Sequence, residues 1–286
     1  MASDATEINR SIFNEEAASY DNKHRKLQNR LQKELLVRLD FIGVDWASED
    51  EDSDENDDED DTKPKRPVRL LDYACGTGMI SRTFAPYMTQ CIGMDISENM
   101  VEAYNTHAEN QGLSPDEMHA IVGDLASETI GDHLSSPDLF NFDLAVVGGG
   151  LHHFENPERA VKRLVERLKP GGVLLIWDFL PHAPRHHGHV PHTNEGTSGH
   201  GVYSSIMHHG FDETRVREMF TAGGAGREFQ FRFIWGGSVS GHGQSTHKND
   251  TSTDEEVKNG DEKDVDEKDL RRQVFFARGT KGSSNI

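Results

Sequence analysis

Residues 70–81 read LLDYACGTGMIS: an apolar run that ends in Asp72 is followed by small residues, among them Gly76 and Gly78. The run is typical of a buried strand, and a helix is expected from about residue 79. Glycine allows positive φ and carries no Cβ, so a ligand can lie close to the backbone of such a loop. The free N–H groups at the start of the following helix suit a carboxylate or a phosphate. Strand, glycine loop and helix in this order predict a ligand site at the carboxyl edge of a parallel sheet.

Strand-like and helix-like segments alternate along the rest of the chain. Helices are expected over 98–111, behind the N-cap residue Ser97, from Asn156–Pro157 to the KPGG sequence, and over 212–222. The alternation requires crossover connections and therefore predicts an α/β fold whose parallel sheet is covered on both faces. The last two apolar segments are expected to form an antiparallel pair at the sheet edge. The predicted strands are 68–74, 90–95, 119–124, 142–147, 173–179, 228–235 and 272–279.

A leucine pattern marks the region before this domain. Leucines recur at every fourth position from Leu27 to Leu39, with Lys and Arg between them. This spacing predicts an amphipathic helix across 11–41 that packs through one apolar stripe. Residues 1–45 are accordingly assigned to an N-terminal helical cap.

Two further segments are acidic and contain few apolar residues. They are a linker at 46–67 and an insert at 238–268, and both are predicted to be disordered because low hydrophobicity and like charge cannot support a core. A specific acidic docking tail is the alternative interpretation. The main domain spans 68–280, with the insert as an expanded loop between its last two strands.

The composition limits the classes of partner and compartment. The chain has 30 basic and 50 acidic residues and a net charge of −20, which argues against a protein that binds nucleic acid. Cys75 and Cys91 are expected to be small buried residues rather than a disulfide pair. The first residues lack the apolar segment of a secretion signal, and no run approaches the ~18 apolar residues of a membrane span. We therefore expect a soluble protein of the cytoplasm, with the nucleus as the alternative.

Carboxylates stand at the ends of three successive predicted strands. Asp72 precedes the glycine loop, Asp95 is placed to accept from ribose hydroxyls, and Asp124 can accept from an adenine amino group. Because the strands are parallel, these ends are expected at one edge of the sheet. Ser81 occupies the place of the third glycine of a dinucleotide fingerprint, and three carboxylates without a Lys or Arg would repel a pyrophosphate. The pattern favours a nucleoside that carries an amino group and a positive charge.

In these segments the chain resembles the class I S-adenosyl-methionine-dependent methyltransferases, over roughly residues 68–280. LLDYACGTG is similar to their first motif, GMDIS to the ribose-binding acid, VGDL to the adenine contact, and FDLAVVGGGLHHF and LKPGGVLLIWDF to the fourth and fifth strands. Within this superfamily the chain looks most like the small-molecule branch related to the UbiE-like enzymes of ubiquinone and menaquinone biosynthesis. The resemblance implies a doubly wound, Rossmann-like sheet of seven strands in the order 3-2-1-4-5-7-6, with strand 7 antiparallel.

The resemblance also implies the cofactor, S-adenosyl-L-methionine, and the residues around its methionine end. Ala74, in place of the usual first glycine, would face this end together with Gly76 and Gly78. Asp72 would orient the ammonium group. Tyr20 belongs to FNEEAASYD, which is similar to a segment that folds over the cofactor in many relatives, and it would close over the sulfonium.

The same resemblance places other residues around the adenosine end. Asp95 would hold the ribose, and Met94 or Ile96 would lie against the adenine. Asp124 and the amide of Leu125 would read the adenine edge. The expected cofactor-binding residues of this end are Asp95, Ile96, Met100, Asp124 and Leu125.

A catalytic base is expected only for some acceptors. A hydroxyl carries a proton at neutral pH and needs a base, whereas a neutral thioether does not. His152 and His153, in GGGLHHF, follow the fourth strand at the mouth of the predicted pocket, and Asp178 ends the fifth strand close enough to orient one of them. This arrangement resembles some sugar and natural-product O-methyltransferases of the superfamily. Alternatively, one His caps the next helix or packs under the loop, and the two rings cannot point the same way if the segment is extended.

Residues 181–210 are rich in His, Pro and Gly and occupy the position of the lid that shapes the acceptor pocket in small-molecule methyltransferases. Three interpretations stay open: a flexible solvated lid, a lid that touches the substrate through its His side chains, and a metal site. The metal site is the least favoured and no metal is predicted, because the short His spacings lack Cys or carboxylate partners. The segment's metal candidates are His187, His189 and His192.

Other side chains near this segment are candidates for the acceptor pocket. His208 and His209 are nearest the sheet and are expected to face the acceptor pocket. Phe179 and Tyr203 are candidates for apolar walls, whereas Phe211 is assigned to the core.

Three functions fit the sequence. The leading one is methyl transfer to a small-molecule acceptor by in-line displacement, with O-methylation favoured. A protein methyltransferase is the second, although GGGL stands where that class often carries an Asn/Asp-Pro-Pro-Tyr tetrad. The third is a non-catalytic protein that binds the cofactor as a scaffold or sensor. The oligomeric state is left open.

Overall fold

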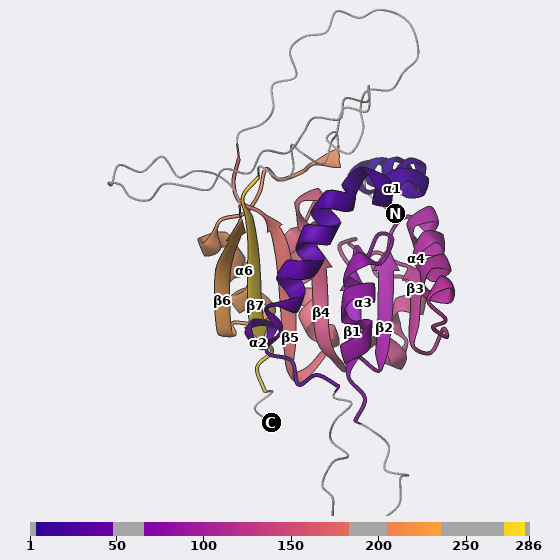
Figure 1. Ribbon diagram of the computed structural model, residues 1–286. Helices are drawn as coiled ribbons and strands as arrows, with labels where there is room; N and C mark the ends of the chain where they lie inside the picture. Colours follow the sequence, from indigo (N-terminus) through magenta and orange to yellow (C-terminus); the bar gives the residue numbers. More distant parts are fainter. Residues whose placement is uncertain (1–3, 48–65, 183–204, 236–271, 284–286) are drawn as a thin grey trace, which may run out of the picture.

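The computed structural model of the chain describes residues 4–47, 66–182, 205–235 and 272–283 (Figure 1). Within these ranges the strands form one seven-stranded sheet in the order β3-β2-β1-β4-β5-β7-β6. Neighbouring strands are parallel from β3 to β5, and β7 is antiparallel to both β5 and β6. This confirms the predicted doubly wound, mostly parallel α/β sheet and its antiparallel edge pair. The strands are β1 Arg69–Tyr73, β2 Gln90–Asp95, β3 Met118–Val122, β4 Phe142–Gly148, β5 Leu168–Phe179, β6 Arg227–Trp235 and β7 Val274–Thr280.

Helices cover both faces of this sheet (Figure 1). The first four helices pack on one hydrophobic core and the last two on a second, and alternate residues of β1 belong to the two cores: Leu70 to the first and Leu71 to the second. Cys75 and Cys91 are buried in the first core and form no disulfide, as predicted. The helices are α1 Asp4–Leu36, α2 Leu39–Ile42, α3 Met79–Phe84, α4 Glu98–Asn110, α5 Pro157–Arg167 and α6 Glu213–Gly223, and the short 3-10 helices are η1 Ala85–Tyr87, η2 Asp132–Ser135, η3 Pro137–Leu139 and η4 Leu151–His153.

Side-chain caps start the helices where the sequence places them. The hydroxyl of Ser97 accepts from the amide of Met100 at the start of α4 (3.1 Å), and the side chain of Asn156 accepts from the amide of Arg159 at the start of α5 (2.8 Å). Such caps satisfy N–H groups that have no partner within the helix. One boundary differs: β5 begins at Leu168, so the KPGG sequence is part of the strand rather than a loop before it.

The N-terminal helix extends beyond the range that the leucine pattern predicts. α1 already begins at residue 4, and a break at 37–38 separates it from α2. Leu27, Leu31 and Leu35 are buried in the first core, which confirms the apolar stripe. The sequence pattern missed the first turns of α1 because the residues there are mostly polar.

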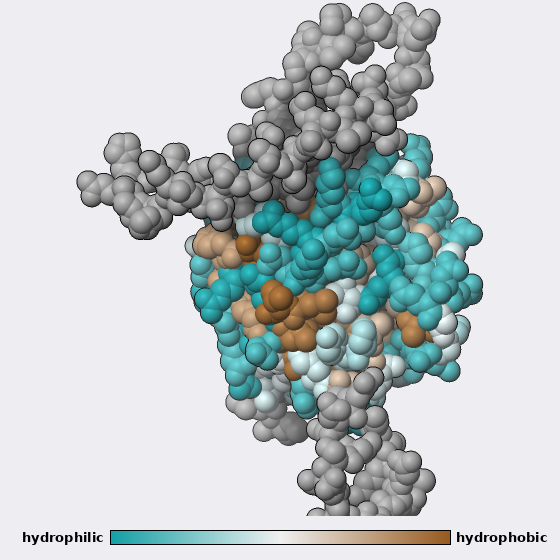
Figure 2. All heavy atoms as spheres, in the orientation of Figure 1, coloured by the Kyte–Doolittle hydropathy of each residue, from teal (hydrophilic) through white to brown (hydrophobic). Residues whose placement is uncertain are grey.

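α2 is fixed to the sheet by a buried side chain. The Nε of Arg278 in β7 donates to the carbonyl oxygen of Ile42 (3.1 Å). Figure 2 shows hydrophilic side chains over the outward face of α1 and a hydrophobic cluster near its C-terminal end, where Leu36 and Val37 are exposed. α1 therefore presents its polar face outward and its apolar stripe to the sheet.

Some predictions concern residues outside the described ranges. The acidic insert at 238–268 lies there entirely, as do residues 48–65 of the linker and 183–204 of the His-rich segment. Among the helices that the structure describes, none is both long enough and apolar enough to cross a membrane.

Candidate functional site

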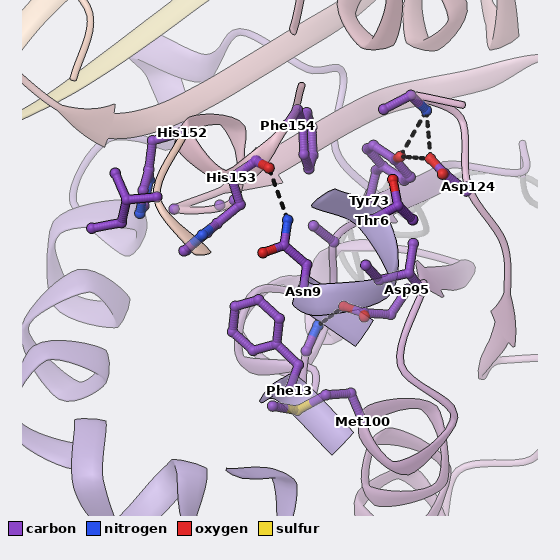
Figure 3. Close-up of a pocket in the computed structure, with 18 of the residues that line it drawn as sticks. Thr6, Asn9, Phe13, Tyr73, Asp95, Met100, Asp124, His152, His153 and Phe154 are labelled. Atoms are coloured by element: carbon purple, nitrogen blue, oxygen red, sulfur yellow. Dashed lines mark hydrogen bonds between the residues drawn. The ribbon is translucent and has the colours of Figure 1, made fainter. Parts of the chain in front are cut away.

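A cavity of about 760 Å³ lies at the carboxyl edge of the sheet, beneath α1 (Figure 3). The loops after β1, β2, β3 and β4 line it, together with the end of β5 and one face of α1. The strand order reverses between β1 and β4, and ligands bind at such a reversal in open α/β sheets. The cavity thus lies at the sheet edge where the sequence predicts a site.

The loop after β1 brings the backbone to the cavity wall. Ala74 and Gly76 line the cavity with φ of 55° and 52°, both in the left-handed region. A Cβ at Gly76 would have no other atom within 4 Å, so the backbone is open at this point. Gly78, with φ of 90°, is not part of the wall, and a Cβ there would lie 2.6 Å from the ring of Tyr104. The glycine at 78 is therefore required by packing between α3 and α4.

Asp95 joins two of the loops around the cavity. Its Oδ2 accepts from the amide of Gly76 (2.9 Å), and its Oδ1 accepts from the amide of Ser97 (2.9 Å). Burial raises the pKa of this carboxyl, although the N–H donors act in the opposite direction. Ile96 and Met100 also belong to the wall. Each carboxylate oxygen has more than one acceptor position, so Asp95 can accept from a ligand while it holds both loops.

Asp124 is held by a tyrosine that the sequence reading missed. The Tyr73 hydroxyl donates to Oδ1 of Asp124 (3.1 Å) and accepts from the amides of Leu125 and Ala126 (both 3.0 Å; Figure 3). The amide of Leu125, predicted to read an adenine edge, is thus engaged by Tyr73, and Leu125 is not part of the wall. All hydrogen bonds that Asp124 accepts from described residues go to Oδ1, so its Oδ2 is left for a ligand.

Asp72 differs from the other two strand-end carboxylates. It is buried but is not part of the cavity wall, and its Oδ2 accepts from the amide (3.2 Å) and the hydroxyl (2.8 Å) of Ser81 in α3. Its Oδ1 is buried without a hydrogen-bond partner among the described residues. Burial raises the pKa of Asp72 to about 7. Of the three predicted carboxylates, the structure brings Asp95 and Asp124 to the cavity and leaves Asp72 at the start of α3.

His152 is oriented by a buried acid. Its Nδ1 lies 2.8 Å from Oδ1 of Asp178, and its amide donates to Oδ2 of the same side chain (3.2 Å). Because a carboxylate only accepts, Nδ1 carries the proton and Nε2 is the acceptor nitrogen of the neutral ring. Asp178 is fully buried and is not part of the wall, whereas His152 is. The predicted pairing of Asp178 with one of the two histidines is present.

His153 lines the same cavity but has other contacts than His152. Its Nδ1 lies 2.9 Å from the hydroxyl of Ser205, its ring centroid lies 4.1 Å from that of His152, and Phe13 meets it edge-on at 5.2 Å. Burial lowers the pKa of His153 well below its usual value, so the ring is neutral. The two rings do face one cavity, because the segment is the 3-10 helix η4 and not an extended strand. We call this part of the cavity the histidine end and the part with Asp95 and Asp124 the acidic end (Figure 3).

The remaining candidates divide between the wall and the surroundings. Tyr20 lines the cavity with its ring centroid 4.5 Å from that of His24, and Phe179 lines it beside His152. His208 and His209 do not line it, contrary to expectation: His208 Nε2 lies 3.0 Å from the carbonyl oxygen of Phe154, and His209 packs on His182.

Other candidates fall elsewhere. Phe211 is a core residue, as assigned. In the part of the chain that the structure describes, no group of three or more His, Cys, Asp or Glu side chains is arranged to hold a metal ion. The remaining candidates lie outside the described residues: His187, His189, His192 and Tyr203.

Of the wall residues that the sequence reading missed, the largest group from one element comes from α1. Its inner face contributes side chains at helical spacing, and the first half of this face is polar, so the leucine pattern did not extend to it. Two missed residues, Trp177 and Arg272, come from β5 and from the residues before β7. The α1 residues missed are Ala5, Thr6, Asn9, Phe13, Glu16, Lys23 and His24.

Comparison with known proteins agrees with the fold. A family model described as "Methyltransferase domain" matches residues 71–176. The uncharacterized methyltransferase C1347.09 of Schizosaccharomyces pombe is 30% identical over 144 residues, which are 49% of this chain and 50% of that protein. A ubiquinone biosynthesis O-methyltransferase of Cereibacter sphaeroides is 29% identical over 164 residues, 57% of this chain and 60% of that protein. The chain thus spans about half the length of the curated relatives it matches.

Among solved structures, the chain is similar to a Haloferax volcanii methyltransferase in complex with the Trm112 methyltransferase activator. The TM-score is 0.52 at 14% identity, with 95% of this chain and 98% of that chain covered. The fold and the site define a Rossmann-like methyltransferase domain. The match over residues 71–176, the relatives and the strand order together support the predicted resemblance to the class I S-adenosyl-methionine-dependent methyltransferases.

Proposed function

We propose that the chain transfers a methyl group from S-adenosyl-methionine to a hydroxyl oxygen of a small molecule. The observation that carries the proposal is the His152–Asp178 pair at one end of a cavity whose other end holds two carboxylates. A wall of this kind offers separate places for an adenosyl cation and for an acceptor that must lose a proton.

The acidic end fits the adenosyl group. Asp95 has acceptor positions left for two ribose hydroxyls, and Oδ2 of Asp124 can accept from an adenine amino group. Ile96 and Met100 supply apolar surface for the adenine ring, and Gly76 leaves its backbone open to the methionine part. When bound, the cofactor supplies a methyl group that its positive sulfur already activates.

The histidine end fits an acceptor with a hydroxyl group. Nδ1 of His152 donates to Asp178, so Nε2 can take the hydroxyl proton as the new O–CH₃ bond forms. The buried carboxylate of Asp178 stabilises the imidazolium that results and keeps the ring oriented. Burial depresses the pKa of His153, so its ring resists taking up a proton and we assign it to the wall and not to the base.

α1 completes the site by excluding water. Its inner face covers both ends of the cavity, and Tyr20 lies in this face. We assign Tyr20 to the closure over the sulfonium, because methyl transfer depends on alignment and on a dry site more than on further chemical groups. Phe179 and Phe13 give the acceptor apolar walls.

The test uses the purified full chain and its own reaction. Calorimetry is expected to detect binding of S-adenosyl-methionine, and incubation with a metabolite extract is expected to yield a small molecule heavier by one methylene. Transfer only to components of a protein extract would overturn the small-molecule acceptor. Binding without transfer in either extract would indicate a non-catalytic protein that binds the cofactor.

A further inference from the structure

We propose that Glu16 and Lys23 of α1 hold the amino-acid end of the cofactor, with Glu16 accepting from the ammonium group and Lys23 donating to the carboxylate. This inference rests on the proposed function, because it concerns the same ligand. It transfers the ammonium contact predicted for Asp72 to a residue of the N-terminal helix. Both side chains are part of the cavity wall, and Asp72 is not.

Two anchors fix the relevant stretch of α1 along the cavity. Oδ1 of Asn14 accepts from the Ser97 hydroxyl (2.6 Å), next to the loop that Asp95 holds. Oδ1 of Asp21 accepts from the Thr77 hydroxyl (2.5 Å), in the glycine loop. At a rise of ~1.5 Å per residue, these anchors are about 10 Å apart along the helix axis.

Glu16 and Lys23 therefore lie over the glycine-loop part of the cavity. Glu16 lies between the two anchors, and Lys23 follows the second anchor within one turn. If Asp95 holds the ribose, the amino-acid part of the cofactor would lie near Gly76, whose amide donates to Asp95, beneath this stretch of α1. The position along the helix matches the part of the ligand that carries both a positive and a negative group.

The carboxylate of Glu16 has an unused oxygen. Its Oε1 lies 3.5 Å from Nζ of Lys23, whereas its Oε2 is buried and has no hydrogen-bond partner among the described residues. A buried acceptor without a partner is unfavourable, so a cationic donor from the ligand would satisfy it. The side chain of Lys23 is 41% exposed and is free to turn toward a carboxylate.

Asp72 is poorly placed for the same contact. Its Oδ2 is used by two donors of Ser81, and the side chain lies outside the cavity wall. With its pKa raised to about 7, it is also partly protonated at neutral pH. Glu16 offers a carboxylate inside the wall, opposite the glycine loop.

Binding of three ligands to the full chain tests the Glu16 contact. The ligands are S-adenosyl-methionine, decarboxylated S-adenosyl-methionine, which keeps the ammonium, and 5′-methylthioadenosine, which lacks both groups. Glu16→Gln should lower the affinity for S-adenosyl-methionine and for decarboxylated S-adenosyl-methionine by at least about 10-fold, which is the effect of one hydrogen bond to a charged group. The affinity for 5′-methylthioadenosine should stay within about 2-fold of the wild-type value. Glu15→Gln is the matched control, because Glu15 is exposed and outside the wall.

The Lys23 contact has its own comparison. Lys23→Met should lower the affinity for S-adenosyl-methionine by at least about 10-fold and leave the affinity for decarboxylated S-adenosyl-methionine unchanged. Arg25→Met removes a positive charge from an exposed position of the same helix and should change neither.

The outcomes separate this inference from the proposed function. If the Glu16→Gln chain loses affinity for 5′-methylthioadenosine as strongly as for S-adenosyl-methionine, the helix has moved and the inference is overturned. Unchanged affinity for all three ligands also overturns it. If the wild-type chain does not bind S-adenosyl-methionine at all, the proposed function itself fails. Far-UV circular dichroism of each variant checks that α1 is still folded.

Discussion

The acidic end and the histidine end of the cavity are held in place by different kinds of contact. At the acidic end, Asp95 and Asp124 each accept from one distant donor, the amide of Gly76 and the hydroxyl of Tyr73, and also from amides two or three residues further along the chain, such as those of Ser97 and Ser127. At the histidine end, the contacts join side chains 26 and 52 residues apart, His152 with Asp178 and His153 with Ser205. Local contacts form with the loop itself, whereas distant ones require several elements to be packed first.

This difference separates two kinds of failure. A substitution at the acidic end should weaken cofactor binding, because the proposed function places the cofactor against the carboxylates there. A substitution at the histidine end should slow the chemical step and leave cofactor affinity unchanged. The following variants test that separation.

The largest effect is expected for His152→Ala. Loss of the base should lower kcat by about 10²–10⁴-fold, with the affinity for S-adenosyl-methionine unchanged, because His152 lies at the other end of the cavity. Initial rates and calorimetry measure the two quantities, and His119→Ala on the edge strand β3 is the control. Equal rates of variant and wild type across pH 6–9 would exclude the base.

Asp72 belongs to neither end of the cavity. It shows what a buried carboxylate outside the cavity wall should do to stability. Its pKa is about 7 in the folded chain, against an ordinary value of 3.8 for the free side chain, so the folded state keeps a proton that the unfolded chain releases. Stability should therefore fall as the pH rises from about 4 to 7 and stay reduced above that range. Three pKa units correspond to at most about 4 kcal/mol.

Asp72→Asn should remove this dependence and raise the free energy of unfolding at pH 8. Urea denaturation at pH 4.5 and at pH 8 measures the difference for both proteins. Asp116→Asn, at an exposed position, is the control. Parallel stability curves for wild type and Asp72→Asn would contradict the raised pKa.

Asp95→Ala should produce the main loss at the acidic end. Two ribose hydroxyls lose a charged acceptor, and the affinity for S-adenosyl-methionine should fall by about 100-fold. Calorimetry with Asp116→Ala as the control measures it. An affinity unchanged by the substitution would remove Asp95 from the site.

Tyr73→Phe should have the smallest effect on stability and on cofactor affinity among the variants of the acidic end. The variant keeps the ring but leaves the amides of Leu125 and Ala126 without their shared acceptor, at a cost of about 1 kcal/mol in stability. Cofactor affinity should fall by less than 10-fold, because Asp124 still accepts from Ala126 and Ser127. A loss as large as that of Asp95→Ala would show that Tyr73 itself contacts the ligand.

Features of the site that depend on local contacts could be predicted from the sequence, and those that depend on long-range contacts could not. Strand ends, the Ser97 cap and the position of Asp95 depend on short-range patterns, and these were predicted correctly. The pairing of His152 with Asp178 was predicted only as one of two options, because no local pattern decides which ring meets the acid. The order of the strands in the sequence also does not predict that Asp72 lies outside the cavity wall, since its position depends on which side of β1 faces α3.

The residues missed by sequence reasoning also depend on tertiary contacts. Tyr73 looks like an apolar strand residue until the loop after β3 is placed over its hydroxyl. The polar first half of α1 has no hydrophobic period, because the surface it covers is a cavity and not a core. Polar residues at helical spacing, such as Asn9 and Glu16, are a signal that could have been used.

One helix covers both ends of the cavity, and this has a consequence for turnover. Displacement of α1 would uncover the acidic end and the histidine end at once, so the exchange of the proposed donor and acceptor should be coupled to the movement of one helix. Weakening the anchors at Asn14 and Asp21 should then speed the departure of both products together. The residence times of two chemically unrelated molecules would then depend on the movement of the same helix.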